Sequence, residues 1–79
     1  MKATITIVKR ETSHYGGDCF LLGFQGEDGK SYRTWIATNC GNYRRWVPII
    51  EQGVGTAVEG LNVKSSHLIN AESFPRVIN

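Results

Sequence analysis

The strongest constraint on the fold is the tetrapeptide Glu27-Asp28-Gly29-Lys30, which lies between two runs rich in β-forming residues. Asp-Gly in such a setting is among the strongest short-range hairpin signals, because glycine adopts positive φ freely and aspartate tolerates it. We therefore expect strands over residues 19–25 and 31–38, joined by this turn. Any fold of this chain must accommodate that hairpin.

The length of the turn decides which side chains share a face of the hairpin. A two-residue turn on Asp28-Gly29 pairs Phe24 with Arg33. A three-residue turn with Gly29 as a G1 bulge pairs Phe24 with Tyr32 instead, and Arg33 and Trp35 then share the opposite face. One residue of slip exchanges the faces. We prefer the bulged turn, because it groups five apolar or aromatic side chains in one core: Phe20, Leu22, Phe24, Tyr32 and Ile36.

Periodicity and turn residues predict the remaining strands. Residues 3–10 alternate with period two, which places Ala3, Ile5 and Ile7 on one face and Thr4, Thr6 and Val8 on the other. The Gly-rich segment 12–18 breaks that pattern and predicts a loop. Further along, we expect a fourth strand over residues 56–64 with a bulge or bend at Gly60, a short fifth strand over residues 67–71, and a tail or last edge contact over residues 76–79.

The segment between the third and fourth strands has mixed signals. Asn42 is a suitable N-cap for a helix over residues 43–52, and Gly53 a suitable end. Pro48 excludes a regular helix through the segment unless it kinks there. We therefore expect one or two helical turns, or a 3₁₀ turn. Trp46 is followed by Val47, Ile49 and Ile50 and is expected in the core.

The composition fits one globular domain over residues 1–79. Hydrophobic residues make up 41% and charged residues 20% of the chain, which argues against disorder. The N-terminal residues alternate instead of forming the apolar run of a signal peptide, and no run approaches membrane-spanning length. We expect a cytoplasmic protein in which Cys19 and Cys40 are reduced thiols.

The order of these elements resembles the OB-fold, an all-β, five-stranded Greek-key barrel with a short helix or irregular link between strands three and four. Glycines lie where strongly coiled strands must bend: Gly23, Gly26, Gly53, Gly55 and Gly60. The resemblance is architectural and involves no family-specific motif, and SH3-like barrels share these features. It implies a single-stranded-DNA-binding-protein-like site across strands two and three, flanked by residues 12–18 and by the loop between strands four and five.

Two segments combine rings with arginines, Tyr32-Arg33-Thr34-Trp35 and Tyr43-Arg44-Arg45-Trp46. An aromatic ring stacks on any base, and a guanidinium contacts phosphate or stacks itself. We therefore expect binding of single-stranded nucleic acid, DNA more than RNA, with low sequence specificity. The candidate nucleic-acid-binding residues are Tyr32, Arg33, Trp35, Tyr43, Arg44, Arg45 and Lys9. The hairpin register decides whether Trp35 faces a ligand or the core.

The net charge of only +2 predicts modest affinity from a single copy. A homo-oligomer or a companion domain on another chain would then be needed for useful binding. The alternative is a small β-barrel protein–protein interaction or oligomerisation module, which the low charge favours and salt dependence would distinguish. Oligosaccharide binding ranks third.

Other chemistry finds little support in the sequence. The possible metal ligands Cys19, Cys40, His14 and His67 lack the spacing of structural zinc sites. There is no nucleophile elbow, P-loop, H-E-x-x-H or dinucleotide fingerprint. We therefore expect no enzyme activity, no catalytic residues, no metal and no cofactor.

Overall fold

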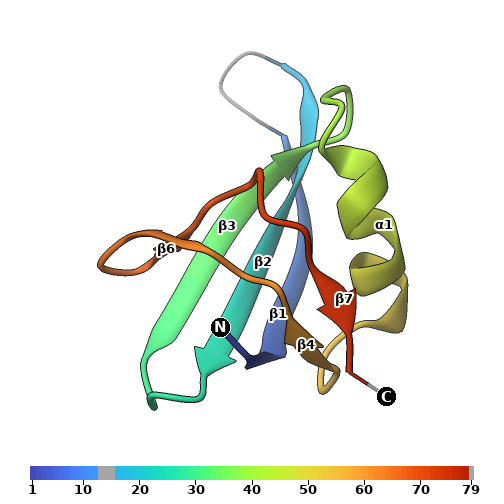
Figure 1. The fold of residues 1–79 in the computed structure, drawn as a ribbon. Coiled ribbons are helices and arrows are strands. Elements are labelled where there is room, and N and C mark those ends of the chain that lie inside the picture. Colours follow the sequence, from blue (N-terminus) through green and yellow to red (C-terminus); the bar gives the residue numbers. More distant parts are fainter. Residues whose placement is uncertain (13–15, 79) are drawn as a thin grey trace.

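The computed structural model describes residues 1–12 and 16–78, where one helix lies among seven strands (Figure 1). In chain order these elements are β1 (Ala3–Thr12), β2 (Asp18–Gly26), β3 (Ser31–Ala37), α1 (Tyr43–Gln52), β4 (Ala57–Glu59), β5 (Val63–Ser65), β6 (Leu68–Ile69) and β7 (Arg76–Val77). Three expectations fall wholly or partly outside the described residues. They are the loop at residues 12–18, the possible metal ligand His14 and the end of the expected tail at Asn79. The expected edge contact of the tail is confirmed, because β7 pairs with β4.

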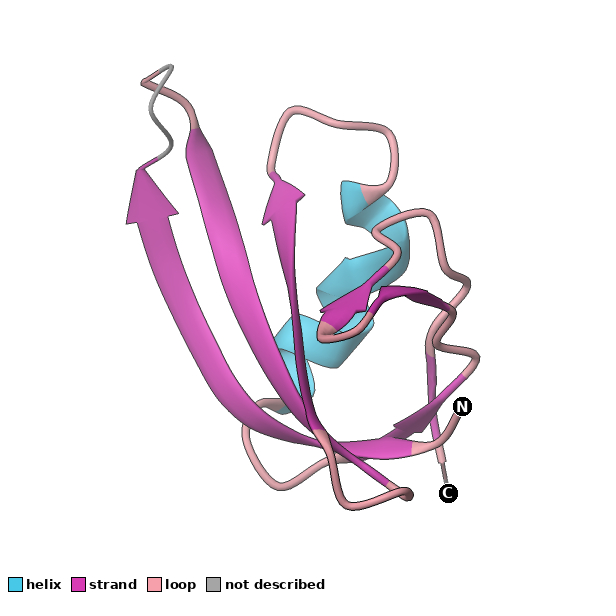
Figure 2. Ribbon diagram, turned by 90° about the vertical axis from the view of Figure 1, so that its left-hand side faces the viewer, coloured by secondary structure: helices cyan, strands magenta, loops and turns pink. Residues whose placement is uncertain are grey.

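All seven strands of the described chain belong to one mixed sheet, in the order β5-β6-β3-β2-β1-β4-β7. β1, β2 and β3 form an antiparallel meander, and β6 runs parallel to β3. β4 and β5 lie on opposite sides of this meander, yet only residues 60–62 separate them in the chain. The sheet therefore curls strongly (Figure 2). The result is a half-barrel compatible with an OB-like architecture.

The strand count exceeds the expected five for two reasons: residues 76–77 of the tail form β7, and the predicted fourth strand is interrupted. β4 pairs with β1, whereas β5 pairs with β6 on the far side of the curl. Gly60, at the break, has a φ of +82°, and a Cβ there would overlap the carbonyl oxygen of Phe74. A side chain is thus excluded at the point where the chain leaves one side of the half-barrel for the other.

The bulged form of the central hairpin is confirmed. Phe24 pairs with Tyr32, and Gly29 has a φ of +82°. The backbone N–H of Gly26 donates to the Lys30 carbonyl at 2.8 Å, and the N–H of Gly29 donates to the Gly26 carbonyl at 3.0 Å. Phe24 and Tyr32 therefore face inward, together with every second residue from them along β2 and β3. The residues that alternate with them face outward.

The expected alternation along β1 is wrong beyond Thr6. Ala3 and Ile5 are buried as expected, but Ile7 is 47% exposed and Val8 packs against the core. The cause is a β-bulge: Ile5 pairs with Phe24 and Ile7 with Gly23, so Thr6 is an extra residue. One inserted residue exchanges the two faces of the strand for every position that follows.

The helical segment expected over residues 43–52 is confirmed, but it is longer than the expected one or two turns. α1 runs unbroken through Pro48 for 10 residues and buries Trp46 and Ile49. Pro48 lies on the exposed side, where the carbonyl that loses its N–H partner can be solvated. Asn42 precedes the helix without capping it, because its Oδ1 accepts from the Arg45 guanidinium at 2.7 Å.

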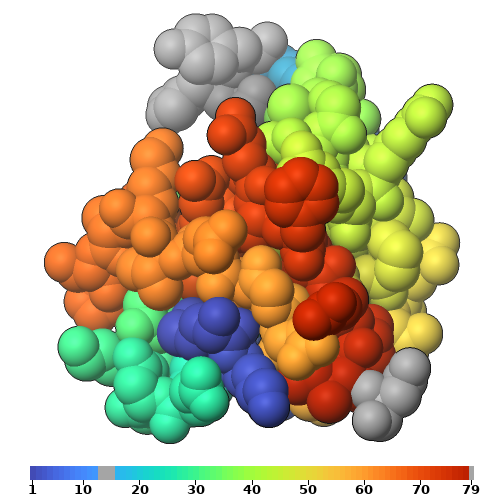
Figure 3. Space-filling model, in the orientation of Figure 1, coloured from blue at the N-terminus to red at the C-terminus, as the bar shows by residue number. Residues whose placement is uncertain are grey.

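The core lies inside the curl, between the meander and α1. Trp46 is 0% exposed, its ring centroid is 6.3 Å from that of Phe24, and its indole N–H donates to the Ala71 carbonyl at 2.8 Å. Figure 3 shows the C-terminal third of the chain, in orange and red, closing over the same space beside α1. Trp46 is therefore a core residue, as expected. No helix in the described part of the chain has the length and apolarity needed to cross a membrane.

Candidate functional site

The side of β1–β3 that points away from α1 is here called the outer face. Side chains alternate across a strand, so the positions between the core residues Phe24, Tyr32 and Ile36 must point outward. The bulge in β1 adds Ile7 to the same side. The outer face of the described strands includes Ile7, Lys9, Glu11, Leu21, Gly23, Ser31, Arg33 and Trp35.

Arg33 and Trp35 form an exposed pair on the outer face. The Arg33 guanidinium carbon lies 5.7 Å from the centroid of the Trp35 ring, a cation–π distance, and Trp35 is 45% exposed. The indole N–H donates to Glu11 Oε1 at 3.2 Å, and Glu11 Oε2 is 3.8 Å from Lys9 Nζ. The ring is thus held at the surface by its edge, while the pair presents an aromatic plane and a positive charge together.

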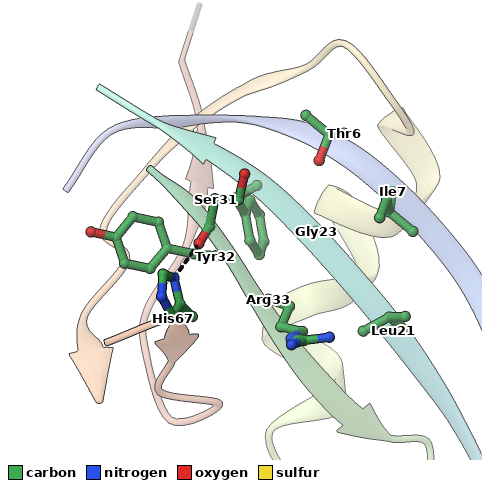
Figure 4. Close-up of a pocket in the computed structure, with 9 residues that line it drawn as sticks. Thr6, Ile7, Leu21, Gly23, Ser31, Tyr32, Arg33 and His67 are labelled. Carbon is green, nitrogen blue, oxygen red and sulfur yellow. Dashed lines mark hydrogen bonds between the residues drawn. The ribbon is translucent and has the colours of Figure 1, made fainter. Parts of the chain in front are cut away.

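Beside this pair the outer face is hollowed (Figure 4). The hollow has a volume of about 430 Å³. Its floor is Gly23, which has no side chain, and Figure 4 shows Arg33 and His67 on its β3 side with Thr6 and Ile7 on its β1 side. The residues that line it are Thr6, Ile7, Leu21, Gly23, Phe24, Ser31, Tyr32, Arg33 and His67.

His67 reaches the hollow from the turn between β5 and β6. Its carbonyl accepts from the backbone N–H of Arg33 at 3.0 Å, and its ring Nδ1 lies 3.2 Å from the Ser31 carbonyl oxygen. A carbonyl oxygen only accepts, so Nδ1 carries a proton and donates. Both contacts tie the turn to β3 and fix the ring at the edge of the hollow.

The structure does not bring the helix candidates to the outer face. Tyr43 stacks on Phe20, with ring centroids 6.2 Å apart and planes 15° apart. Arg45 donates to the carbonyls of Glu72 and Ser73 at 2.8 and 3.4 Å. Arg44 is exposed on α1. Since α1 packs on the core side of the sheet, these three residues lie on the other side from Arg33, Trp35 and Lys9.

Tyr32, also a candidate, is only 7% exposed and is part of the core. Its hydroxyl donates to Asp28 Oδ2 at 2.6 Å. This bond, with the Lys30 backbone N–H at Oδ1, holds the pKa of Asp28 below its ordinary value, and the same bond raises the pKa of Tyr32. Tyr32 therefore fastens the turn to the sheet, and its ring is not presented for stacking.

Sequence reasoning missed most residues of the hollow, in particular Ile7, Ser31 and His67. The resemblance to the OB-fold did point to the loop between strands four and five, but the sequence placed His67 at the start of the fifth strand, whereas it lies in the turn between β5 and β6. Gly23 offered a second signal, because a glycine inside a strand often marks the close approach of another group. Ile7 was missed because nothing in the sequence marks the bulge at Thr6.

Other chemistry remains sparse in the described structure. Cys19 is buried and Cys40 is exposed, and both are free thiols. Among residues 1–12 and 16–78, no three His, Cys, Asp or Glu side chains gather as a metal site would require. The outer face, with its hollow, is the best-formed candidate site.

Comparisons with known proteins add no family assignment: no family model matches the chain, and no curated protein or solved structure is significantly similar to it. The function must therefore be argued from the residues and their geometry.

Proposed function

We propose that the protein binds single-stranded nucleic acid, DNA more than RNA, on the outer face of β1–β3. The observation that carries the proposal is the exposed Arg33–Trp35 pair beside the hollow. An exposed indole stacks on an unpaired base for about 1–3 kcal/mol, and a neighbouring guanidinium contacts phosphate or stacks as well. Lys9, on the same face, adds a second positive charge near the end of β1, which Glu11 at 3.8 Å partly balances.

The architecture supports this proposal. If β4 and β5 are counted as one strand broken at residues 60–62, the described chain has six strands. Without the two-residue strand β7 at the sheet edge, the remaining five follow the chain order of an OB-fold, with a helix after the third. The parallel pairing of β3 with β6 and the antiparallel pairing of β1 with β4 suit a Greek-key barrel. Proteins of this architecture bind oligonucleotides across strands two and three, where Arg33, Trp35 and Leu21 lie here.

A single strand is favoured over a duplex for a physical reason. Stacking on Trp35 needs a base whose face is free, and bases in a duplex are already stacked on their neighbours. The net charge of +2 supplies little general attraction, so a single copy binds modestly and a homo-oligomer or a companion domain would strengthen it.

Fluorescence anisotropy tests the proposal with labelled single strands and a duplex of equal length at several salt concentrations. We expect the single strand to bind more tightly and its affinity to fall as salt rises. Failure of both ligands to bind folded protein would contradict the proposal.

A second candidate function is protein–protein interaction, because the surface carries large apolar side chains. Phe74 is 72% exposed, Val63 and Ile7 are each 47% exposed, and β5 is an edge strand. Such a surface suits an apolar partner or a second copy. Association of this kind would respond little to salt, which separates it from nucleic-acid binding.

A further inference from the structure

We propose that the hollow on the outer face receives one base of the bound strand and prefers bases that carry a keto group: guanine, thymine and uracil. This inference rests on the proposed function, because Trp35 and Arg33 must first hold the strand. It adds a modest base preference to binding that is otherwise insensitive to sequence.

The shape of the hollow suits one flat ring. Its volume of about 430 Å³ lies in the lower part of the range of about 300–1,000 Å³ for small-ligand sites. Gly23 lets the Ile7 side chain pack closely over β2, since a Cβ at Gly23 would lie 3.0 Å from the Ile7 Cβ. Ile7 and Leu21 give the hollow an apolar wall. A base seated there would cover part of the exposed Ile7 side chain, which the bulge at Thr6 turns toward solvent.

The polar side of the hollow has a defined pattern of donors and acceptors. Because Nδ1 of His67 donates to the Ser31 carbonyl, Nε2 of the neutral ring is an acceptor. No described residue forms a hydrogen bond with Nε2. Arg33, which lines the same side, only donates. An acceptor and a donor therefore lie along the β3 side of the hollow, as Figure 4 shows for His67 and Arg33.

A keto base matches this pattern and an amino base does not. Thymine, uracil and guanine each present a ring N–H beside a carbonyl oxygen, so the N–H can donate to His67 while the carbonyl accepts from Arg33. Cytosine and adenine have an amino group in place of that carbonyl and an unprotonated ring nitrogen in place of the N–H. The amino group of cytosine or adenine would then face the donor Arg33, and the unprotonated ring nitrogen would face the acceptor Nε2 of His67. Neither pair can form a hydrogen bond.

Competition binding with matched homopolymers tests the preference, in weakly alkaline buffer where cytosine is unprotonated. Oligo-dT and oligo-dC of equal length differ in the keto and amino groups and in the C5-methyl group of thymine. Oligo-dI and oligo-dA form the corresponding purine pair, in which no methyl group differs. We expect about fivefold tighter binding of oligo-dT than of oligo-dC, the effect of roughly one net hydrogen bond, and a preference of the same direction for oligo-dI. Equal affinities within both pairs would overturn the inference.

Two variants connect the preference to the hollow. His67→Phe keeps an aromatic ring but removes both nitrogens, and we expect it to bring the dT/dC ratio to about one while leaving residual binding through Trp35. Gly23→Ala would press a methyl group against Ile7, which lines the hollow, and should lower the ratio by displacing that wall. Gly41→Ala is the matched control, since no atom lies within 4 Å of a Cβ built there and Gly41 does not line the hollow. An unchanged ratio in His67→Phe would overturn the inference.

The failure of this inference is distinguishable from failure of the proposed function. If oligo-dT and oligo-dC bind equally and both are weakened by salt, single-strand binding stands and the base site is overturned. If no oligonucleotide binds the folded protein, both are overturned.

Discussion

At the scale of single residues, Arg33 and Arg44 show how differently two exposed arginines can be placed. Arg33 lies on β3 with its guanidinium 5.7 Å from the Trp35 ring, whereas Arg44 lies on α1, on the other side of the sheet. The sequence favoured both as phosphate ligands, because both stand beside aromatic residues. Only Arg33 shares a surface with the exposed indole and the hollow.

Arg33→Ala is expected to weaken binding to all single strands and to reduce the salt slope by about 0.7, the value for one lost phosphate contact on a single strand. Arg44→Ala should leave both the affinity and the slope nearly unchanged. Anisotropy titrations at several salt concentrations measure the two quantities. A larger effect of Arg44→Ala than of Arg33→Ala would move the site to α1.

The bond between Tyr32 and Asp28 makes a pH-dependent contribution to the stability of the hairpin. The Tyr32 hydroxyl lowers the pKa of Asp28 from 3.8, so the stabilisation is present above that pH and is lost as the pH falls through the lowered pKa. The same bond raises the pKa of Tyr32 from 10.0. The stabilisation that protonated Tyr32 gives the hairpin is therefore present below that pH and is lost as the pH rises through the raised pKa.

Thermal melts on acidification test this contribution. We expect the wild-type protein to lose more stability than Tyr32→Phe as the pH falls below 3.8, because the variant keeps the ring but lacks the hydroxyl. The Lys30 N–H still contacts Asp28 in the variant, so some acid sensitivity should remain. Identical losses in the two proteins would show that the hydroxyl does not couple to Asp28.

At the scale of elements, α1 is fastened to the segment that precedes β7 by Arg45. Its guanidinium donates to two carbonyls of that segment, at Glu72 and Ser73, and to Asn42 Oδ1, and it lies 4.2 Å from the Phe74 ring centroid. The two carbonyls belong to residues 27 and 28 positions further along the chain than Arg45. Arg45, which the sequence suggested as a nucleic-acid-binding residue, instead holds α1 to the segment before β7.

Removing that contact should destabilise the fold. We expect Arg45→Ala to lower the free energy of unfolding by about 1–3 kcal/mol, the usual cost of losing hydrogen bonds to a charged group. Arg44→Ala, one position earlier on the exposed side of the same helix, is the matched control and should change it by less than about 0.5 kcal/mol. Urea denaturation measures both. Equal stabilities of the two variants would contradict the role given to Arg45.

The elements also show where prediction from sequence succeeds. The position of the central hairpin was predictable, because Asp28-Gly29 marks the turn. The sequence allowed two registers, and the one preferred because it groups the apolar side chains is the one observed. The bulge in β1 was not predictable, because Thr6 has no property that distinguishes it from Thr4. The unbroken α1 was not predictable either, since burial of Trp46 and Ile49 outweighs the cost of Pro48.

At the scale of the whole molecule, the curl of the sheet determines which residues meet. It brings the turn that contains His67 against β3, so residues 36 positions apart, Ser31 and His67, form one side of the hollow. The sequence predicted Arg33 and Trp35 on one face, because they are two residues apart on one strand. Lys9 joins them only through the bulge at Thr6, which the sequence did not predict. The sequence could not predict the contribution of His67, which depends on the parallel pairing of β3 with β6.

The most direct test of the central claim is tryptophan fluorescence during titration with a single strand and with a duplex of equal length. Trp35 is 45% exposed and Trp46 is 0% exposed, so a ligand on the outer face should quench only Trp35. We expect quenching by the single strand that added salt reverses, little response to the duplex, and no quenching in Trp35→Phe. No quenching of the wild-type protein by the single strand, or equal quenching in Trp35→Phe, would contradict binding on the outer face.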